Sequence, residues 1–137
     1  MSGAGNLLGM ARRAGAVQIG EEASAQAVLD HKARLILVTA DAGASGAERM
    51  FRLESEKVPV LTVSDTKAEL GGILGFASCA ACAVTDLGLA SAIVKQLAAE
   101  DPRAAELSSV LEARAKKAQR RKADTRKLGK KSSRKKK

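Results

Sequence analysis

The amino-acid sequence predicts an α/β protein, a three-layer αβα sandwich in which helices cover both faces of a four-stranded central sheet. Segments with apolar residues at helical spacing alternate with short β-like runs, in the order αβαβαβαβα over residues 6–99. The run RLILVTA at residues 34–40 is almost continuously apolar, which is typical of a strand buried on both faces. The length of 137 residues allows one such domain with an appendage.

The first two helices flank a short strand. Leucine and alanine recur at helical spacing over residues 6–14, and residues 16–19 form a short β-like run. Gly20 then opens a second helix, with Glu21 and Glu22 in its first turn. Because carboxylates there interact favourably with the positive end of the helix dipole, we expect the helix to begin at this point.

Capping boxes, in which Ser or Thr is followed three residues later by Glu, predict the next two helix starts. Ser45 and Glu48 mark the third helix, and Thr66 and Glu69 mark the fourth. Residues 60–63 form the strand between them. The alternation of helix and strand therefore continues through the middle of the chain.

Aspartate caps are expected for the last two helices. After a strand at residues 79–85, Asp86 is the predicted N-cap of a helix over residues 88–99. Asp101 is the next N-cap, with Pro102 at the first helical position of a sixth helix.

The charge of the chain is unevenly distributed. Residues 1–101 contain 9 Lys or Arg and 12 Asp or Glu, a net −3, whereas residues 102–137 contain 15 and 3, a net +12. We expect a folded domain over 1–101 and a basic C-terminal extension over 102–137, helical to about residue 122 and then disordered. The asymmetry predicts a nucleic-acid partner, with a solubilising role as the alternative. No apolar run suits a membrane span or a signal peptide, so we expect a cytoplasmic protein.

Residues suited to catalysis or metal binding are scarce. Cys79 and Cys82 form a CxxC pair, but in a β strand their side chains would point to opposite faces, so we predict two buried structural cysteines. With His31 as the single histidine, the chain has too few ligands for a tetrahedral zinc site and few candidates for catalysis. The glycine-rich residues 71–75 lie within a predicted helix, which excludes a dinucleotide-binding loop. We expect no enzyme activity, metal or cofactor.

Phe51 and Phe76 are the only aromatic residues. Modules that stack single-stranded bases on several aromatic rings are therefore disfavoured. The remaining mode is recognition of a folded RNA by backbone groups and helix N-termini, strengthened by a cationic arm that neutralises phosphates.

Five segments of the chain carry a resemblance to a known family. They are, in order, NLLGMARRAGAVQIGEEAS, KARLILVTADA, KVPVLTV, ELGGILGFA and ACAVTDLGLASAIVKQL. Together, over residues 5 to about 99, they resemble the bacterial YlxQ-type members of the ribosomal protein L-seven-Ae superfamily. The resemblance implies a mixed central sheet, a role linked to the ribosome or translation, and kink-turn or similarly bent RNA as the ligand.

The family's main RNA-reading pattern, Gly-x-Asn-Glu-x-x-Lys, falls on the start of the second helix. Gly20 is kept, and Glu21 stands at the variable position. Glu22 replaces the Asn, Ala23 the Glu and Gln26 the Lys. One phosphate-seeking cation and two polar base contacts are therefore changed, and the paired carboxylates repel phosphate.

Further candidate contacts lie outside that helix. The resemblance places Phe76 and Ser78 in a loop that packs on exposed nucleobases, although Phe76 could instead pack in the core. Arg12 and Arg13 could flank the same RNA face or form a solvated helix end. The candidate phosphate contacts of the extension are Lys116, Lys117, Arg120, Arg121, Lys122, Arg126 and Lys127.

Together these features predict a monomeric, non-catalytic, ribosomal-protein-like RNA-binding protein. Its domain would select a kink-turn-like RNA and its extension would supply most of the affinity. The alternative is a protein-docking module of a translation or transcription complex, which the extension only localises on RNA. A substrate-binding domain of an RNA methyltransferase ranks last, because no catalytic domain is present in the sequence.

Overall fold

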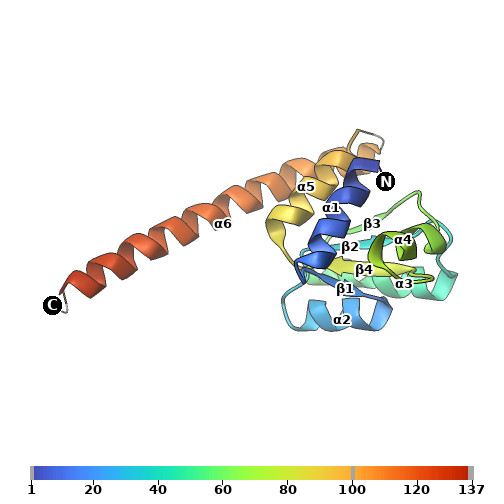
Figure 1. Cartoon of the computed structure of the whole chain (residues 1–137), viewed down its shortest axis with the longest axis horizontal. Helices are drawn as coiled ribbons and strands as arrows, with labels where there is room; N and C mark the ends of the chain where they lie inside the picture. Colours follow the sequence, from blue (N-terminus) through green and yellow to red (C-terminus); the bar gives the residue numbers. More distant parts are fainter. Residues whose placement is uncertain (1, 100, 136–137) are drawn as a thin grey trace.

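The structure is a computed structural model that describes residues 2–99 and 101–135, with side chains described within 3–99 and 101–121. Its elements follow the predicted alternation, and the last helix projects beyond the domain (Figure 1). They are α1 (Ser2–Arg13), β1 (Val17–Ile19), α2 (Glu21–Leu29), β2 (Leu35–Val38), α3 (Ala44–Phe51), the 3-10 helix η1 (Arg52–Glu56), β3 (Val60–Thr62), α4 (Lys67–Leu74), β4 (Ala81–Val84), α5 (Leu87–Leu97) and α6 (Pro102–Lys135).

The four strands form one mixed sheet in the order β1-β4-β2-β3. β4 is antiparallel to both of its neighbours, β1 and β2, whereas β2 and β3 are parallel. The mixed sheet implied by the family resemblance is therefore confirmed, with β1 and β3 at its edges.

Alternate residues of β2 face the two sides of the sheet. Leu35 and Leu37 pack in one hydrophobic cluster with residues of α1, α4, α5 and α6, and Ile36 and Val38 pack in another with residues of α2 and α3. All four side chains are at most 1% exposed. The three-layer αβα sandwich and the doubly buried strand are thus confirmed.

One of the two predicted capping boxes is present. The Thr66 hydroxyl accepts a hydrogen bond from the Glu69 amide at 3.2 Å, and the Glu69 carboxylate accepts one from the Thr66 amide at 3.0 Å. These hydrogen bonds lower the pKa of Glu69, because they stabilise its charged form. The start of α4 is therefore confirmed.

The predicted box at Ser45 is wrong. Helix α3 begins one residue earlier, at Ala44, with Gly43 as its N-cap and no side-chain cap. Ser45 therefore lies inside the helix and not at its N-cap, where the box would form. The Glu48 carboxylate lies 3.6 Å from the Arg52 guanidinium, one turn further along the chain.

Both predicted aspartate caps are confirmed. The Asp86 carboxylate accepts a hydrogen bond from the Leu89 amide at 2.8 Å at the start of α5. The Asp101 carboxylate accepts one from the Arg103 amide at 2.9 Å, with Pro102 as the first residue of α6. Each cap satisfies a backbone donor that has no partner inside its helix.

The prediction that Cys79 and Cys82 lie in one strand on opposite faces is wrong. β4 begins only at Ala81, and both cysteines are buried in the same hydrophobic cluster. The period-two rule fails because Cys79 belongs to the preceding loop, where its thiol donates a hydrogen bond to the Ala81 carbonyl oxygen at 3.1 Å. Both cysteines are free and buried, as predicted.

The hydrophobic core extends past residue 101 into α6. Ala104 and Leu111 are fully buried and belong to the same cluster as α5. Helix α6 runs back along α5, passes its N-terminal end and then leaves the domain (Figure 1). In the structure α6 continues past the predicted helix end near residue 122, to Lys135, through a segment rich in Lys and Arg, which favour the helical conformation.

Candidate nucleic-acid interface

The structure brings three of the predicted contact segments together at one end of the sheet. The Gly20 amide, at the β1-α2 junction, donates a hydrogen bond to the Ala81 carbonyl oxygen at 2.9 Å. Ala81 begins β4, and the loop before it contains Phe76 and Ser78. From α1, the Arg12 guanidinium lies over the Phe76 ring, 5.8 Å from its centroid. Segments that are far apart in the sequence thus form one surface.

Gly20 has a conformation that favours glycine. Its φ of 98° lies in the region that side chains rarely adopt, and it begins α2 without a side-chain cap. The Ser24 amide and hydroxyl both donate to the Gly20 carbonyl oxygen, at 3.0 and 2.7 Å. The backbone turn is therefore held from within the helix. The Gly20–Ala81 hydrogen bond places the positive end of α2 next to the residue at which the Phe76 loop enters β4.

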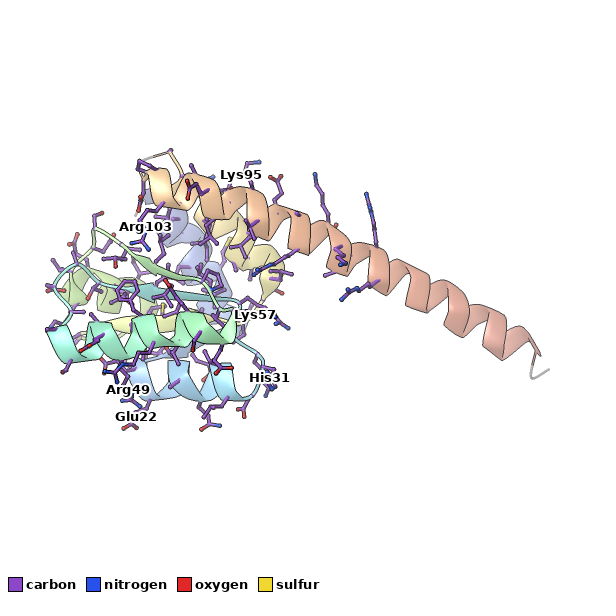
Figure 2. All side chains as sticks on the ribbon, turned by 180° about the vertical axis from the view of Figure 1, so that it is seen from behind. Glu22, His31, Arg49, Lys57, Lys95 and Arg103 are labelled. Atoms are coloured by element: carbon purple, nitrogen blue, oxygen red, sulfur yellow. The ribbon has the colours of Figure 1, made fainter. Side chains whose placement is uncertain are left out.

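The two carboxylates of the first turn of α2 have different surroundings. Glu21 lies against Gly46 of α3, so close that a Cβ at Gly46 would overlap its carboxylate. Glu22 is exposed and lies on the outer side of the domain (Figure 2). From the sequence alone the two carboxylates are expected to behave alike. In the structure, however, the Glu21 side chain lies toward the neighbouring helix α3 and that of Glu22 does not.

Gln26 and Arg13 are exposed, and both side chains lie along their own helices. The Gln26 amide donates to the Asp30 carboxylate at 3.1 Å, toward the C-terminal end of α2. The Arg13 guanidinium lies beside Gly9, 3.7 Å from the position that a Cβ would take there. Arg12 is therefore the cation of α1 that contacts Phe76.

The structure decides between the two interpretations of Phe76. Its side chain is 47% exposed, so it is not part of the core. The Arg12 guanidinium lies over one face of the ring, and about half of the residue remains exposed to solvent. An exposed aromatic ring fixed by a cation can stack against a planar group such as a nucleobase.

Gly71 sets the position of the Phe76 loop. A Cβ at Gly71 would lie 2.7 Å from the Phe76 carbonyl oxygen and 2.8 Å from the Ser78 amide nitrogen. Both are backbone atoms, so they cannot rotate away. We expect Gly71→Ala to destabilise the protein by about 1–3 kcal/mol, as measured by urea unfolding.

The adjacent Gly72 is the matched control for this prediction. It lies in the same helix, but a Cβ there would meet nothing within 4 Å. Gly72→Ala should leave stability unchanged or raise it by up to about 1 kcal/mol, because alanine favours the helix. Equal effects of the two substitutions would show that the close approach at Gly71 does not restrain the loop.

The predicted contacts of the extension lie on different faces of α6. Lys116, Lys117, Arg120 and Arg121 are all exposed, but only Lys117 and Arg121 line a cleft against the domain. Lys122, Arg126 and Lys127 belong to the helix, and their side chains lie outside the described residues.

Sequence reasoning missed two residues of this cleft, Arg34 and Arg114. The spacing of three and seven residues from Arg114 to Lys117 and Arg121 marks a common helix face. Nothing in the sequence links that face to Arg34, which directly precedes β2.

The cysteines and the remaining acidic residues form no evident reactive site in the described part of the chain. Burial raises the pKa of the Cys79 thiol and, more strongly, that of the Cys82 thiol, so both stay protonated near neutral pH. No group of three or more His, Cys, Asp or Glu among the described residues could hold a metal ion. Within the same residues, no helix is both long enough and apolar enough to cross a bilayer.

Comparisons with known proteins agree with this architecture. No profile of a known protein family matches the chain. The RNA-binding protein YlxQ of Bacillus subtilis (strain 168) is 34% identical over 92 residues, which are 66% of this chain and 91% of that protein.

Two solved structures have a similar fold. A protein of unknown function from Bacillus halodurans C matches with a TM-score of 0.64 at 27% identity, over 67% of this chain and 93% of that one. The Giardia lamblia 15.5kD RNA binding protein matches with a TM-score of 0.55 over 80% of this chain and 84% of that one, and at 19% identity it supports the fold alone. From the curated relative and the shared fold, the chain belongs to the YlxQ-type members of the ribosomal protein L-seven-Ae superfamily.

Proposed function

We propose that this chain is a non-catalytic RNA-binding protein that recognises structured, kink-turn-like RNA, in association with the ribosome or translation in the cytoplasm. The observation that carries the proposal is the surface where the N-terminal end of α2, the exposed Phe76 ring and Arg12 meet. It lies on the segments that the family resemblance assigns to RNA reading. The name of the Bacillus subtilis relative supports RNA as the ligand class.

Each part of this surface has a physical role in the proposal. The Phe76 ring offers an apolar face to an unstacked base, as sheared or bent RNA exposes. Arg12 restrains the ring and places a positive charge where the RNA backbone approaches. The uncapped first turn of α2 presents backbone amides to polar base edges or phosphates.

The charge distribution supports a division of labour between domain and extension. With a net −3, residues 1–101 gain little from non-specific attraction to phosphates, whereas residues 102–137 carry +12. We propose that the domain discriminates between RNA shapes and that the extension supplies most of the affinity. The protein would act as a monomer.

The test is equilibrium binding of the full chain to a kink-turn RNA and to a plain duplex of the same length, at several salt concentrations. We expect both to bind and the kink-turn to bind more tightly. Equal affinities would contradict shape recognition. Absence of RNA binding would favour the alternative, a protein-docking module. That alternative is based on the net negative charge of residues 1–101 and on the exposure of Glu22.

Phe76→Ala should remove the preference for the kink-turn. Loss of one base-stacking contact weakens binding by about 1–3 kcal/mol, while binding of the plain duplex should stay nearly constant. Folding should be little affected, because the side chain is 47% exposed.

Val110→Ala is the control for Phe76→Ala. Val110 is equally exposed, at 46%, but lies on α6 beside β3, the opposite edge strand of the sheet. The Val110→Ala substitution should leave the affinity for the kink-turn RNA and the affinity for the plain duplex unchanged. If Phe76→Ala weakens kink-turn and duplex binding alike, the ring does not read RNA shape.

A further inference from the structure

A cleft of about 530 Å³ separates α6 from the end of the sheet and the start of α5. It lies at the far end of β4 from the surface just described. At this end the Arg34 amide donates to the Val84 carbonyl oxygen at 2.8 Å, whereas at the other end the Gly20 amide donates to the Ala81 carbonyl oxygen. The cleft is therefore separate from the proposed RNA-reading surface.

Basic side chains dominate the lining of the cleft. It is lined by Arg34, Thr85, Asp86, Leu87, Arg114, Lys117, Ala118 and Arg121. Four of these residues are cationic and one is acidic. Asp86, the acidic one, already caps α5 through the Leu89 amide. The cleft thus has a formal charge of +3 although the surrounding domain is acidic, so it attracts anions.

The cationic lining continues the buried face of α6. Ala104 and Leu111 attach this face to α5, and Arg114, Lys117 and Arg121 follow at helical spacing beyond the end of α5. Figure 1 shows α6 passing the start of α5 before it leaves the domain. Because packing at Leu111 sets the rotation of the helix, these three exposed cations lie on the side of α6 that lines the cleft.

We propose that this cleft binds the phosphodiester backbone of an RNA strand, an inference that rests on the proposed function and adds a second contact site to it. Arg114 and Arg121 are seven residues apart, which is about 10 Å along the helix, longer than a single phosphate group. A polymer with a phosphate at each nucleotide matches this spacing.

The two walls of the cleft suit such a strand. Arg34 stands on the wall opposite α6, and guanidinium groups bind phosphate oxygens with two parallel hydrogen bonds. The cleft also lies where α6 leaves the domain, and the sequence that follows Arg121 contains nine further Lys and Arg. An RNA strand that follows the extension is therefore led into the cleft.

The test compares two triple variants of the full chain that lose the same charge. The cleft variant is Arg34→Gln, Arg114→Gln and Lys117→Gln. The control is Lys32→Gln, Lys57→Gln and Lys95→Gln, which changes exposed lysines of the domain that do not line the cleft.

We expect the cleft variant to bind RNA at least ~10-fold more weakly at about 100 mM salt, and the slope of log affinity against log salt to fall by about two. The control should change affinity less than ~3-fold, since its cations make only diffuse contributions. All six residues are exposed, so thermal unfolding should confirm that both variants fold.

A second measurement uses the unmodified chain. Bound RNA should protect Lys117 from acetylation by an amine-reactive reagent, while Lys95, an exposed lysine of α5 that does not line the cleft, stays reactive. Equal losses of affinity in the two variants, or equal protection of the two lysines, would overturn the cleft as a site while leaving RNA binding itself intact. Absence of RNA binding by the unmodified chain would overturn the proposed function and this site with it.

Discussion

RNA affinity is expected to fall about 100-fold at about 100 mM salt when the nine Lys and Arg residues of positions 122–137 are replaced by Gln. Each cation that neutralises a phosphate releases a counterion, so the salt dependence should flatten together with the loss of affinity. Gln has nearly the helix propensity of Lys and Arg, so α6 should persist. The measurement is equilibrium binding to kink-turn and duplex RNA over a range of salt concentrations.

The control for this prediction keeps the charge. Exchanging the seven Lys of positions 122–137 for Arg should preserve affinity and salt dependence within a few-fold. The ratio of kink-turn to duplex affinity should survive the Gln replacements, because the proposal assigns discrimination to the domain. If the Gln replacements abolished the preference for the kink-turn but left RNA affinity unchanged, the extension and not the domain would discriminate between RNA shapes, which would contradict the proposal.

Leu111→Ala is expected to destabilise the protein by about 2–5 kcal/mol. Leu111 lies on α6, outside the predicted domain of residues 1–101, yet it is fully buried in the core cluster that includes α5. Removing its side chain leaves a cavity between the two helices. Urea unfolding of the full chain, followed by circular dichroism, measures the effect.

Val110→Ala is the neighbouring control, because that side chain is 46% exposed. It should change stability by less than about 1 kcal/mol. Similar small effects for both substitutions would mean that α6 does not contribute to the core. The expected difference also explains why binding experiments need the full chain: removal of residues 102–137 would uncover the surface that Ala104 and Leu111 cover.

Much of the fold could be predicted from the sequence because its signals are local. Helix starts at Thr66, Asp86 and Asp101 depend on side chains within three residues of the cap, and the structure has all three. The local signal failed at Ser45, because α3 begins one residue earlier, at Ala44, with Gly43 as its N-cap. It also failed at Cys79, because a run of small apolar residues does not mark where a strand begins.

The candidate surface was predictable only in part. Gly20, Phe76 and Arg12 came from the family resemblance, and the structure brings them to one end of the sheet. Exposure of Phe76 could not be predicted, because an aromatic residue after an apolar helix suits the core as well as the surface. Arg34 was missed because the cations on the opposite wall of the cleft lie about eighty or more residues away in the sequence.

Composition and periodicity by themselves determined the alternation of helices and strands, the doubly buried β2 and the separation of an acidic domain from a basic extension. Only the tertiary structure decided that α6 begins as part of the core and that one of its cationic faces closes a cleft over the sheet end. The physical reason is that charge and hydrophobicity are properties of single residues, whereas the direction in which a helix presents them depends on how it packs. Here the packing of Leu111 against α5 sets that direction for Arg114 and Lys117.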